Sequence, residues 1–139
     1  MKMFLWIVVC VITVLIVGLA YIRFAPSDAA QWHVPITADA DKTMEGGAIR
    51  VLDATEDSLA QADAAMRALP RTEHLAGSVE EGRITYVTRS FWMNFPDYTT
   101  VEVSDGKLRM LARLRFGRSD FGVNARRLDG LVSSLQAGG

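Results

Sequence analysis

Cysteine is nearly absent from this chain. Its 139 residues include one, Cys10, which lies inside a long apolar run near the N-terminus. No disulfide can therefore form within the chain, and this excludes a small fold held together by disulfides. The lack of disulfides does not indicate a reducing compartment, because many exported domains have none.

Residue patterns that bind metals or carry catalysis are scarce as well. The two histidines, His33 and His74, are far apart, and no Cys-x-x-Cys or His-x-x-x-His spacing occurs, so a zinc site is not expected. A Gly-x-Ser-x-Gly nucleophile elbow is also missing. These absences predict no metal, no cofactor and no catalytic residue, and they favour a non-catalytic function over an enzyme.

The chain also lacks an excess of either charge. Its formal net charge is −1, which gives no reason to expect nucleic acid as a partner. The charges are unevenly distributed, because residues 24–82 hold four cations and eleven acids, whereas residues 83–139 hold nine cations and five acids. Either the two halves attract each other in the fold, or the second half presents a basic patch to an anionic partner.

What the chain does contain is an uncharged apolar run over residues 3–22, with Thr13 as its one clearly polar residue. At a rise of 1.5 Å per residue, about 20 helical residues span the ~30 Å hydrocarbon core of a bilayer. The run is apolar on all sides, which argues against a buried helix of a soluble domain. It predicts a single transmembrane anchor over residues 1–23 and a membrane as the partner of residues 3–22.

A cleaved signal peptide is the alternative to a permanent anchor. Gly18 and Ala20 have the small-residue spacing of a cleavage site, but the run is longer than the usual h-region of about 7–15 residues. A lipoprotein modified at Cys10 is not expected, since a valine precedes it where a small residue is needed. Lys2 and the N-terminal amine oppose Arg23 across the run, a bias that places the N-terminus inside and the domain outside.

The next segment, residues 24–47, shows little periodicity. Prolines, aspartates and a Gly-Gly pair interrupt it, a composition typical of irregular chain. We expect an extended, partly ordered tether here, with Trp32 and Val34 docking on the domain that follows.

Residues 48–136 alternate between strand and helix patterns and predict one α+β domain. A short strand over residues 48–52 precedes a helix that Asp53 or Thr55 caps, with Glu56 at capping-box spacing, and that ends at Pro70. The order β-α-β-β-β-β-α fits a small antiparallel sheet with two helices on one face. The later elements are expected as strands over residues 72–79, 83–90, 98–104 and 107–116 and a helix over residues 123–136.

The sequence from Arg71 onward, most sharply RFGRSDFGVN at residues 115–124, resembles the family known as domain of unknown function 1499. The resemblance covers roughly residues 46–136. Relatives often carry a cysteine-containing segment ahead of the first helix, and no role that depends on that cysteine applies to this chain. The resemblance implies a bacterial or plastid envelope setting, often with a membrane segment, and no activity. With the charge bias, it predicts a single-pass protein of the bacterial inner membrane whose C-terminal domain is periplasmic.

The Asp105-Gly106 turn predicts a hairpin in which Ser104 faces Lys107 and Glu102 faces Arg109. Because strand side chains alternate between two faces, one face of this hairpin is apolar and the other is crowded with cations. The crowded face is either a solvated surface with a Glu102–Arg109 pair, or a shallow anion site suited to the two-pronged donor of arginine. The candidate anion-binding residues are Lys107, Arg109, Arg113, Arg115 and Tyr98.

The loop over residues 117–122 is expected to be structural. Ser119 or Asp120 can cap the last helix, where a carboxylate is favoured by the helix dipole. Asp120 can also pair with Arg118 or Arg126, and Asp97 is expected to pair with Arg115. The two glycines of the loop permit positive φ. The residues assigned to this turn, cap and set of ion pairs are Asp97, Gly117, Arg118, Ser119, Asp120, Gly122 and Asn124.

These patterns favour a membrane-tethered, non-catalytic envelope module that binds an anionic small molecule, a lipid headgroup or a protein partner. A carrier of an apolar, lipid-like ligand is the alternative, and an enzyme of unknown class is less favoured. A flat basic face would favour the binding module, and a dry apolar pocket under the last helix would favour the carrier. A deep polar pocket with shifted pKa values would favour the enzyme.

Overall fold

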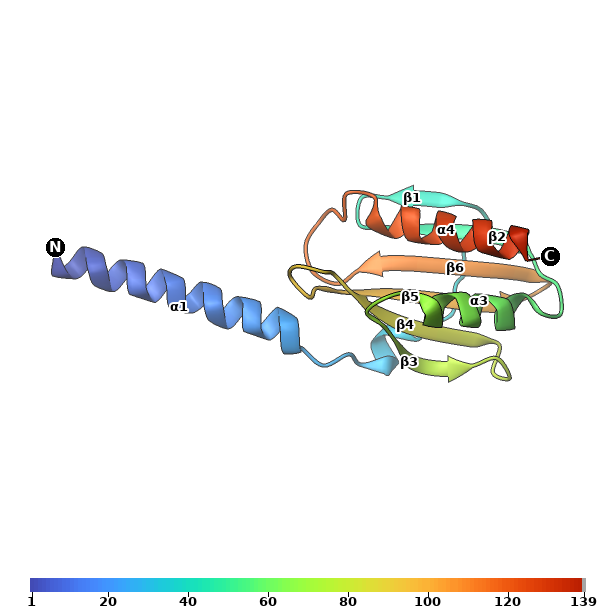
Figure 1. Ribbon diagram of the computed structural model, residues 1–139, viewed down its shortest axis with the longest axis horizontal. Coiled ribbons are helices and arrows are strands. Elements are labelled where there is room, and N and C mark those ends of the chain that lie inside the picture. Colours follow the sequence, from blue (N-terminus) through green and yellow to red (C-terminus); the bar gives the residue numbers. More distant parts are fainter. Residues whose placement is uncertain (139) are drawn as a thin grey trace.

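Six antiparallel strands form one sheet in the order β1-β2-β6-β5-β4-β3 in the computed structural model, which describes residues 1–138. β2 therefore lies beside the last strand, β6, and hairpins join β3 to β4, β4 to β5 and β5 to β6. Figure 1 shows α3 and α4 side by side on one face of this sheet. The elements are α1 Lys2–Phe24, α2 Ala29–Trp32, β1 Lys42–Met44, β2 Gly47–Asp53, α3 Ser58–Ala68, β3 Thr72–Ser78, β4 Arg83–Arg89, β5 Pro96–Ser104, β6 Lys107–Leu114 and α4 Val123–Ala137.

The prediction of an α+β fold, with an antiparallel sheet and two helices on one face, is confirmed. From β2 onward the element order is the predicted one. Two short elements, α2 and β1, lie in the segment that showed no periodicity. Elements of three and four residues are too short to produce a detectable repeat.

The face beneath α3 and α4 holds the main apolar core. Met66 of α3 and Leu128 of α4 are fully buried against Ile84, Val101 and Met110 of the sheet. This packing explains the three- and four-residue spacing of apolar residues in both helices, because that spacing places them on one side. It also explains the alternation in β5 and β6, which turns every second side chain toward the helices.

The β5–β6 hairpin has the predicted register. Ser104 lies opposite Lys107 and Glu102 opposite Arg109. Asp105 and Gly106 both have positive φ, at 51° and 70°, as a two-residue turn of this kind requires.

The start of α3 differs from the prediction of an Asp53–Glu56 capping box. Asp53 pairs with Lys107 across the β2–β6 register at 2.5 Å instead. The hydroxyl of Ser58 accepts a hydrogen bond of 2.8 Å from the backbone N–H of Thr55. α3 begins at Ser58 after Asp57, whose side chain makes no capping bond, so neither Asp53 nor Thr55 is the N-cap that the sequence predicts.

α1 projects away from the domain and buries none of its residues. Among the described residues it is the one helix long and apolar enough to cross a membrane, and a signal sequence would pass the same test. Its last turn contacts the domain at two points. The ring of Tyr21 lies edge-on to Phe116, with 6.2 Å between ring centres, and the backbone oxygen of Arg23 accepts a 3.3 Å hydrogen bond from Arg89.

These contacts distinguish the two ends of the sheet. The α1 end carries the β4–β5 loop over residues 90–95 and the β6–α4 loop over residues 115–122, and Figure 1 shows both loops on the side from which α1 projects. The far end carries the turns over residues 79–82 and 105–106.

Candidate functional site

The sheet face opposite α3 and α4 is covered by residues 25–39, which we call the strap. Ala25, Trp32 and Ile36 of the strap are buried. The indole ring of Trp32 stacks on the ring of Tyr98, with 3.9 Å between centres and 9° between planes. The docking predicted for Trp32 is therefore confirmed, and most of the segment predicted as a tether lies on the sheet.

Three arginines of the predicted cationic face hold the strap through its backbone oxygens. Arg115 donates to the oxygen of Pro26 at 2.8 Å, and Arg113 to that of Trp32 at 3.3 Å. Arg109 donates to the oxygen of Ala38 at 3.1 Å. The strap runs antiparallel to this part of the chain, so the acceptors at positions 26, 32 and 38 meet the donors in reverse order.

Further contacts of these side chains are with the same chain. Arg109 pairs with Asp39 at 2.7 Å, and the guanidinium of Arg113 lies 4.8 Å from the centre of the Trp32 ring. The burial of Arg113 lowers its pKa from the ordinary arginine value. Arg115 also donates to the hydroxyl of Tyr98 at 3.1 Å. The strap therefore takes up the donors of these three arginines, and Arg109 is buried beneath it.

The expected ion pair between Glu102 and Arg109 is wrong, although the two residues are cross-strand neighbours. The buried carboxylate of Glu102 pairs with Arg83 on the other side and accepts a 3.4 Å hydrogen bond from the backbone N–H of Ile36. Arg109 is taken by Asp39. The strap supplies a partner to each residue, and its docking could not be foreseen from the hairpin alone.

Lys107, the remaining cation of the predicted anion-binding face, lies at the far end. Its ammonium group pairs with Asp53, and both side chains are exposed. It is therefore separated from the arginines that hold the strap. Tyr98 lies among those arginines but is buried, with its hydroxyl 2.7 Å from that of Ser27.

At the α1 end, the β6–α4 loop has the predicted turn and cap. The carboxylate of Asp120 accepts hydrogen bonds from the backbone N–H groups of Gly122 and Asn124, at 2.9 and 3.0 Å. The two loop glycines, Gly117 and Gly122, have φ of 96° and 77°. Ser119 accepts from the backbone N–H of Phe121 at 3.2 Å. The loop glycines and Asp120 thus act as the sequence predicts, whereas Ser119 bonds within the loop and not to α4.

The arginines near this loop do not pair with Asp120. Within residues 1–138, no ion pair joins Asp120 to Arg118 or Arg126. Arg126 donates instead to the backbone oxygen of Phe121 at 3.1 Å, and the side chain of Arg118 is exposed. Arg118 and Arg126 are thus two exposed arginines in and next to this loop.

The expected pair between Asp97 and Arg115 is also wrong. Strand alternation places Asp97 on the helix face and Arg115 on the strap face. Asp97 instead accepts a 3.2 Å hydrogen bond from Asn124 and lies 3.7 Å from Arg127, both on α4. Burial raises the pKa of Asp97, with Arg127 and Asn124 acting against the rise, and burial lowers the pKa of Arg127. The network joins the start of α4 to β5.

A cavity of about 310 Å³ opens at the α1 end between the two loops. Phe95, Leu114, Phe116 and Val123 give it apolar walls, and Asp97 and Asp120 lie in its polar part among its lining residues. Since Phe116 also contacts Tyr21, the cavity lies beside the last turn of α1.

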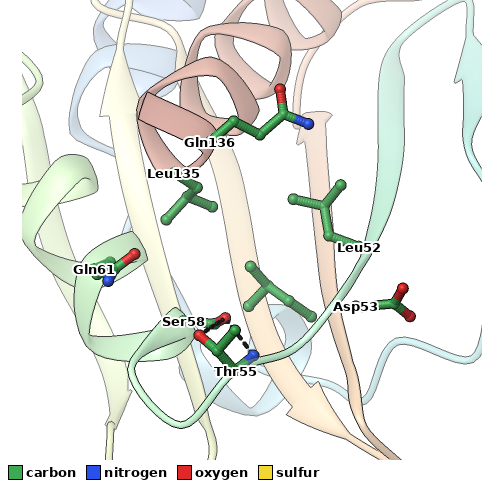
Figure 2. A pocket seen from close by; sticks show the side chains of 8 residues that line it. Leu52, Asp53, Thr55, Ser58, Gln61, Leu135 and Gln136 are labelled. Atoms are coloured by element: carbon green, nitrogen blue, oxygen red, sulfur yellow. Dashed lines mark hydrogen bonds between the residues drawn. The ribbon is translucent and has the colours of Figure 1, made fainter. Parts of the chain in front are cut away.

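A second cavity, of about 270 Å³, opens at the far end beneath the C-terminal turn of α4. Figure 2 shows Leu52 and Leu135 across from Thr55 and Ser58 in this cavity. The two hydroxyls lie 2.9 Å apart and bond to each other. Neither contacts a histidine or carboxylate that could act as a base within the described part of the chain, so the cavity has no nucleophile–base pair.

Across residues 1–138, no three histidine, cysteine, aspartate or glutamate side chains are grouped so that they could hold a metal ion. Residues 24–135 match the model of the family described as "Protein of unknown function (DUF1499)". The chain belongs to this family. The DUF1499 match begins at residue 24 and so includes the strap, which the resemblance read from the sequence did not cover. A search of curated proteins found no match.

Proposed function

We propose that this DUF1499 protein is a membrane-anchored, non-catalytic module that binds an anionic lipid headgroup at the membrane surface. α1 is the anchor in this proposal. The location is the bacterial inner membrane, with the domain on the periplasmic side, as the charge bias of Lys2 and Arg23 favours. The observation that carries the proposal is the cavity at the α1 end, which lies beside the last turn of the anchor.

The chemistry of the cavity suits an amphiphile. Its walls are largely apolar. Two exposed arginines are near it in the chain, Arg118 in the loop that lines it and Arg126 in the first turn of α4. Arginine binds phosphate and carboxylate with paired donors, which favours an anionic headgroup beside this loop. Phe116, between the cavity and Tyr21, places the apolar part next to the membrane-spanning helix.

The size of the cavity favours a headgroup over a whole lipid. Small-molecule sites usually measure about 300–1,000 Å³, and this cavity, at about 310 Å³, is at the lower limit. The cavity is too small to enclose a lipid with its acyl chains. A surface site that a lipid occupies without leaving the bilayer fits better than a carrier that extracts it.

Lipid retention by the full chain tests this proposal. The protein is extracted in mild detergent, and the copurifying phospholipids are identified by mass spectrometry. We expect wild type to retain anionic phospholipid and Arg118→Gln/Arg126→Gln to lose it. The matched control, Lys42→Gln/Lys107→Gln, removes the same number of charges away from the cavity and should behave as wild type. Equal retention by all three proteins would remove the headgroup site.

The anchor has its own test. Intact-mass analysis of the membrane fraction should find the chain with residues 1–23 attached. A mature chain that begins at Tyr21 would show that the segment is a cleaved signal peptide.

A further inference from the structure

Exposed apolar side chains are concentrated at the α1 end of the domain. Phe91, Trp92 and Phe121 are 68%, 86% and 87% exposed, and Met93 and Val123 are also exposed. Among the large apolar residues that follow α1 within the described chain, Val79 is the one exposed side chain outside this group. A concentration of exposed aromatic groups on one end indicates a surface that another phase or molecule covers.

We propose that the loops over residues 90–95 and 115–122 insert their aromatic side chains into the interface of the bilayer leaflet that α1 enters. This surface, which we call the aromatic end, is a second membrane contact beside the anchor. The proposal rests on the anchoring role of α1 given above, but it concerns the bilayer surface and not a bound headgroup.

The proposal follows from the depth at which the last turn of α1 would lie in the membrane. Tyr21 is the second-last residue of the uncharged run over residues 3–22, so it lies at the edge of the hydrocarbon core when that run spans the bilayer. Phe116 touches Tyr21, and Arg89 donates both to the oxygen of Arg23 and to that of Asn94, at 3.3 and 3.4 Å. Each loop is thus linked to the last turn of α1, and Figure 1 shows them level with that turn. Their exposed rings lie where the headgroups begin.

The residue types fit that depth. Tryptophan is enriched at the membrane–water interface, and phenylalanine inserts there from amphipathic surfaces. Arg71 lies over the ring of Phe91, with 5.3 Å from guanidinium to ring centre, and Arg118 and Arg126 are exposed nearby. Together with the exposed Arg23, these cations outnumber the exposed acids of the adjoining segments, Asp28, Glu45 and Glu73, which favours a leaflet that contains anionic lipid.

The backbone at Phe121 supports a role for its ring. Its φ is 52°, in the left-handed region where glycine and asparagine are usual and a bulky residue is strained. The ring gains no packing from this conformation, because the side chain is 87% exposed. The loop therefore exposes the Phe121 ring at a cost in backbone strain. A contact between this ring and something outside the chain explains that cost.

Tryptophan fluorescence of the full chain in nanodiscs tests the proposal. The discs contain phosphatidylcholine and phosphatidylglycerol, with or without bromine near the headgroup end of the acyl chains. The chain has three tryptophans. The emission of Trp6 and of Trp92 is obtained by comparing wild type with Trp6→Phe, Trp92→Phe and the double variant, since Trp32 contributes equally to all four. We expect the Trp92 emission to be shifted to the blue and quenched by brominated lipid, as Trp6 is.

The two tryptophans separate this proposal from the anchor. One outcome is that brominated lipid quenches Trp6, while Trp92 emits as in water and is not quenched. This result would overturn the docking and leave the anchor intact. An unquenched Trp6 would overturn the anchor and the docking together. A blue-shifted Trp92 that brominated lipid does not quench would mean that a second copy or another protein covers the surface, which also overturns the proposal.

A substitution provides a further check with a matched control. Phe91→Ser, which lies outside the headgroup cavity, should reduce the quenching of Trp92, and Val79→Ser at the far end should not. Equal quenching in both variants would count against insertion of the β4–β5 loop. These fluorescence readouts do not depend on lipid retention in detergent. The experiments can therefore support the docking and refute the headgroup site, or refute the docking and support the headgroup site.

Discussion

The two faces of the sheet are covered in different ways. On one face, α3 and α4 bury aliphatic and methionine side chains such as Met66, Leu128 and Met110. On the other, the strap is held by one aromatic stack and by arginines that donate to backbone oxygens. The first kind of cover depends on buried area, the second on a few directional contacts. We therefore expect the helix face to set the stability of the domain and the strap face to open locally.

The strongest test of this difference removes volume from the helix face. Met110→Ala should lower the free energy of unfolding by about 2–5 kcal/mol, because the methionine side chain is fully buried and leaves a cavity. Chemical denaturation of the detergent-solubilised full chain, followed by circular dichroism, measures the change. A loss below about 1 kcal/mol, the usual cost of an average substitution, would mean that this face does not dominate stability.

Trp32→Ala is the corresponding change on the strap face. We expect a loss of about 1–3 kcal/mol, below the ~3–5 kcal/mol usual for a core tryptophan, because the strap can open locally and need not leave a cavity where the ring stacked on Tyr98. Hydrogen exchange should show faster exchange over residues 25–39, with the amides of α3 and α4 unchanged. Equal acceleration on both faces would show that they unfold as one unit and would break the comparison.

The arginine contacts can be removed without touching the stack. Arg113→Gln/Arg115→Gln should lower stability by about 1–2 kcal/mol, since two charged donors to strap oxygens are lost. Lys42→Gln/Lys107→Gln should stay within about 0.5 kcal/mol, as exposed changes usually do. A double arginine variant no less stable than that control would mean that Trp32 alone holds the strap.

The smallest effect concerns pH. Burial, and next the charge of Arg83, lower the pKa of His33, whose ring nitrogen lies 2.9 Å from the hydroxyl of Thr85. A folded pKa below the unfolded value gives stability that is complete above the unfolded pKa of about 6.5 and is lost as pH falls from there through the lower folded pKa. The free energy of unfolding should therefore fall more steeply with acidification in wild type than in His33→Gln. Parallel pH profiles would show that His33 does not couple the strap to protonation.

The helix face could be predicted from sequence because its contacts repeat. Leu59 and Met66 follow the period of a helix, and Asp105-Gly106 sets the register of β5 and β6. The strap could not be predicted, since its acceptors are backbone oxygens that every residue carries. Trp32 and Val34, two large apolar residues in an otherwise irregular segment, were the signals of it in the sequence.

The candidate site was predicted in part. The cap by Asp120 follows from residue type and position, and it is confirmed. The partners of Asp97 depend on which residues of α4 reach β5, which requires the packing of a helix on a sheet. The cavity beside Phe116 depends on where α1 ends relative to two loops. No pattern along the chain encodes such distances between separate elements.

The strap is made early in synthesis, and its partners are made late. Arg115 follows Pro26 by 89 residues, and Thr100, another donor to the strap, follows Trp32 by 68. Residues 25–39 therefore leave the ribosome long before β5 and β6 exist, and in a chain whose α1 has entered the membrane they are free in the meantime. Fifteen extended residues reach about 50 Å, so the growing chain can move far from the bilayer at first. Completion of β6 removes that freedom and fixes the distance between the finished domain and α1.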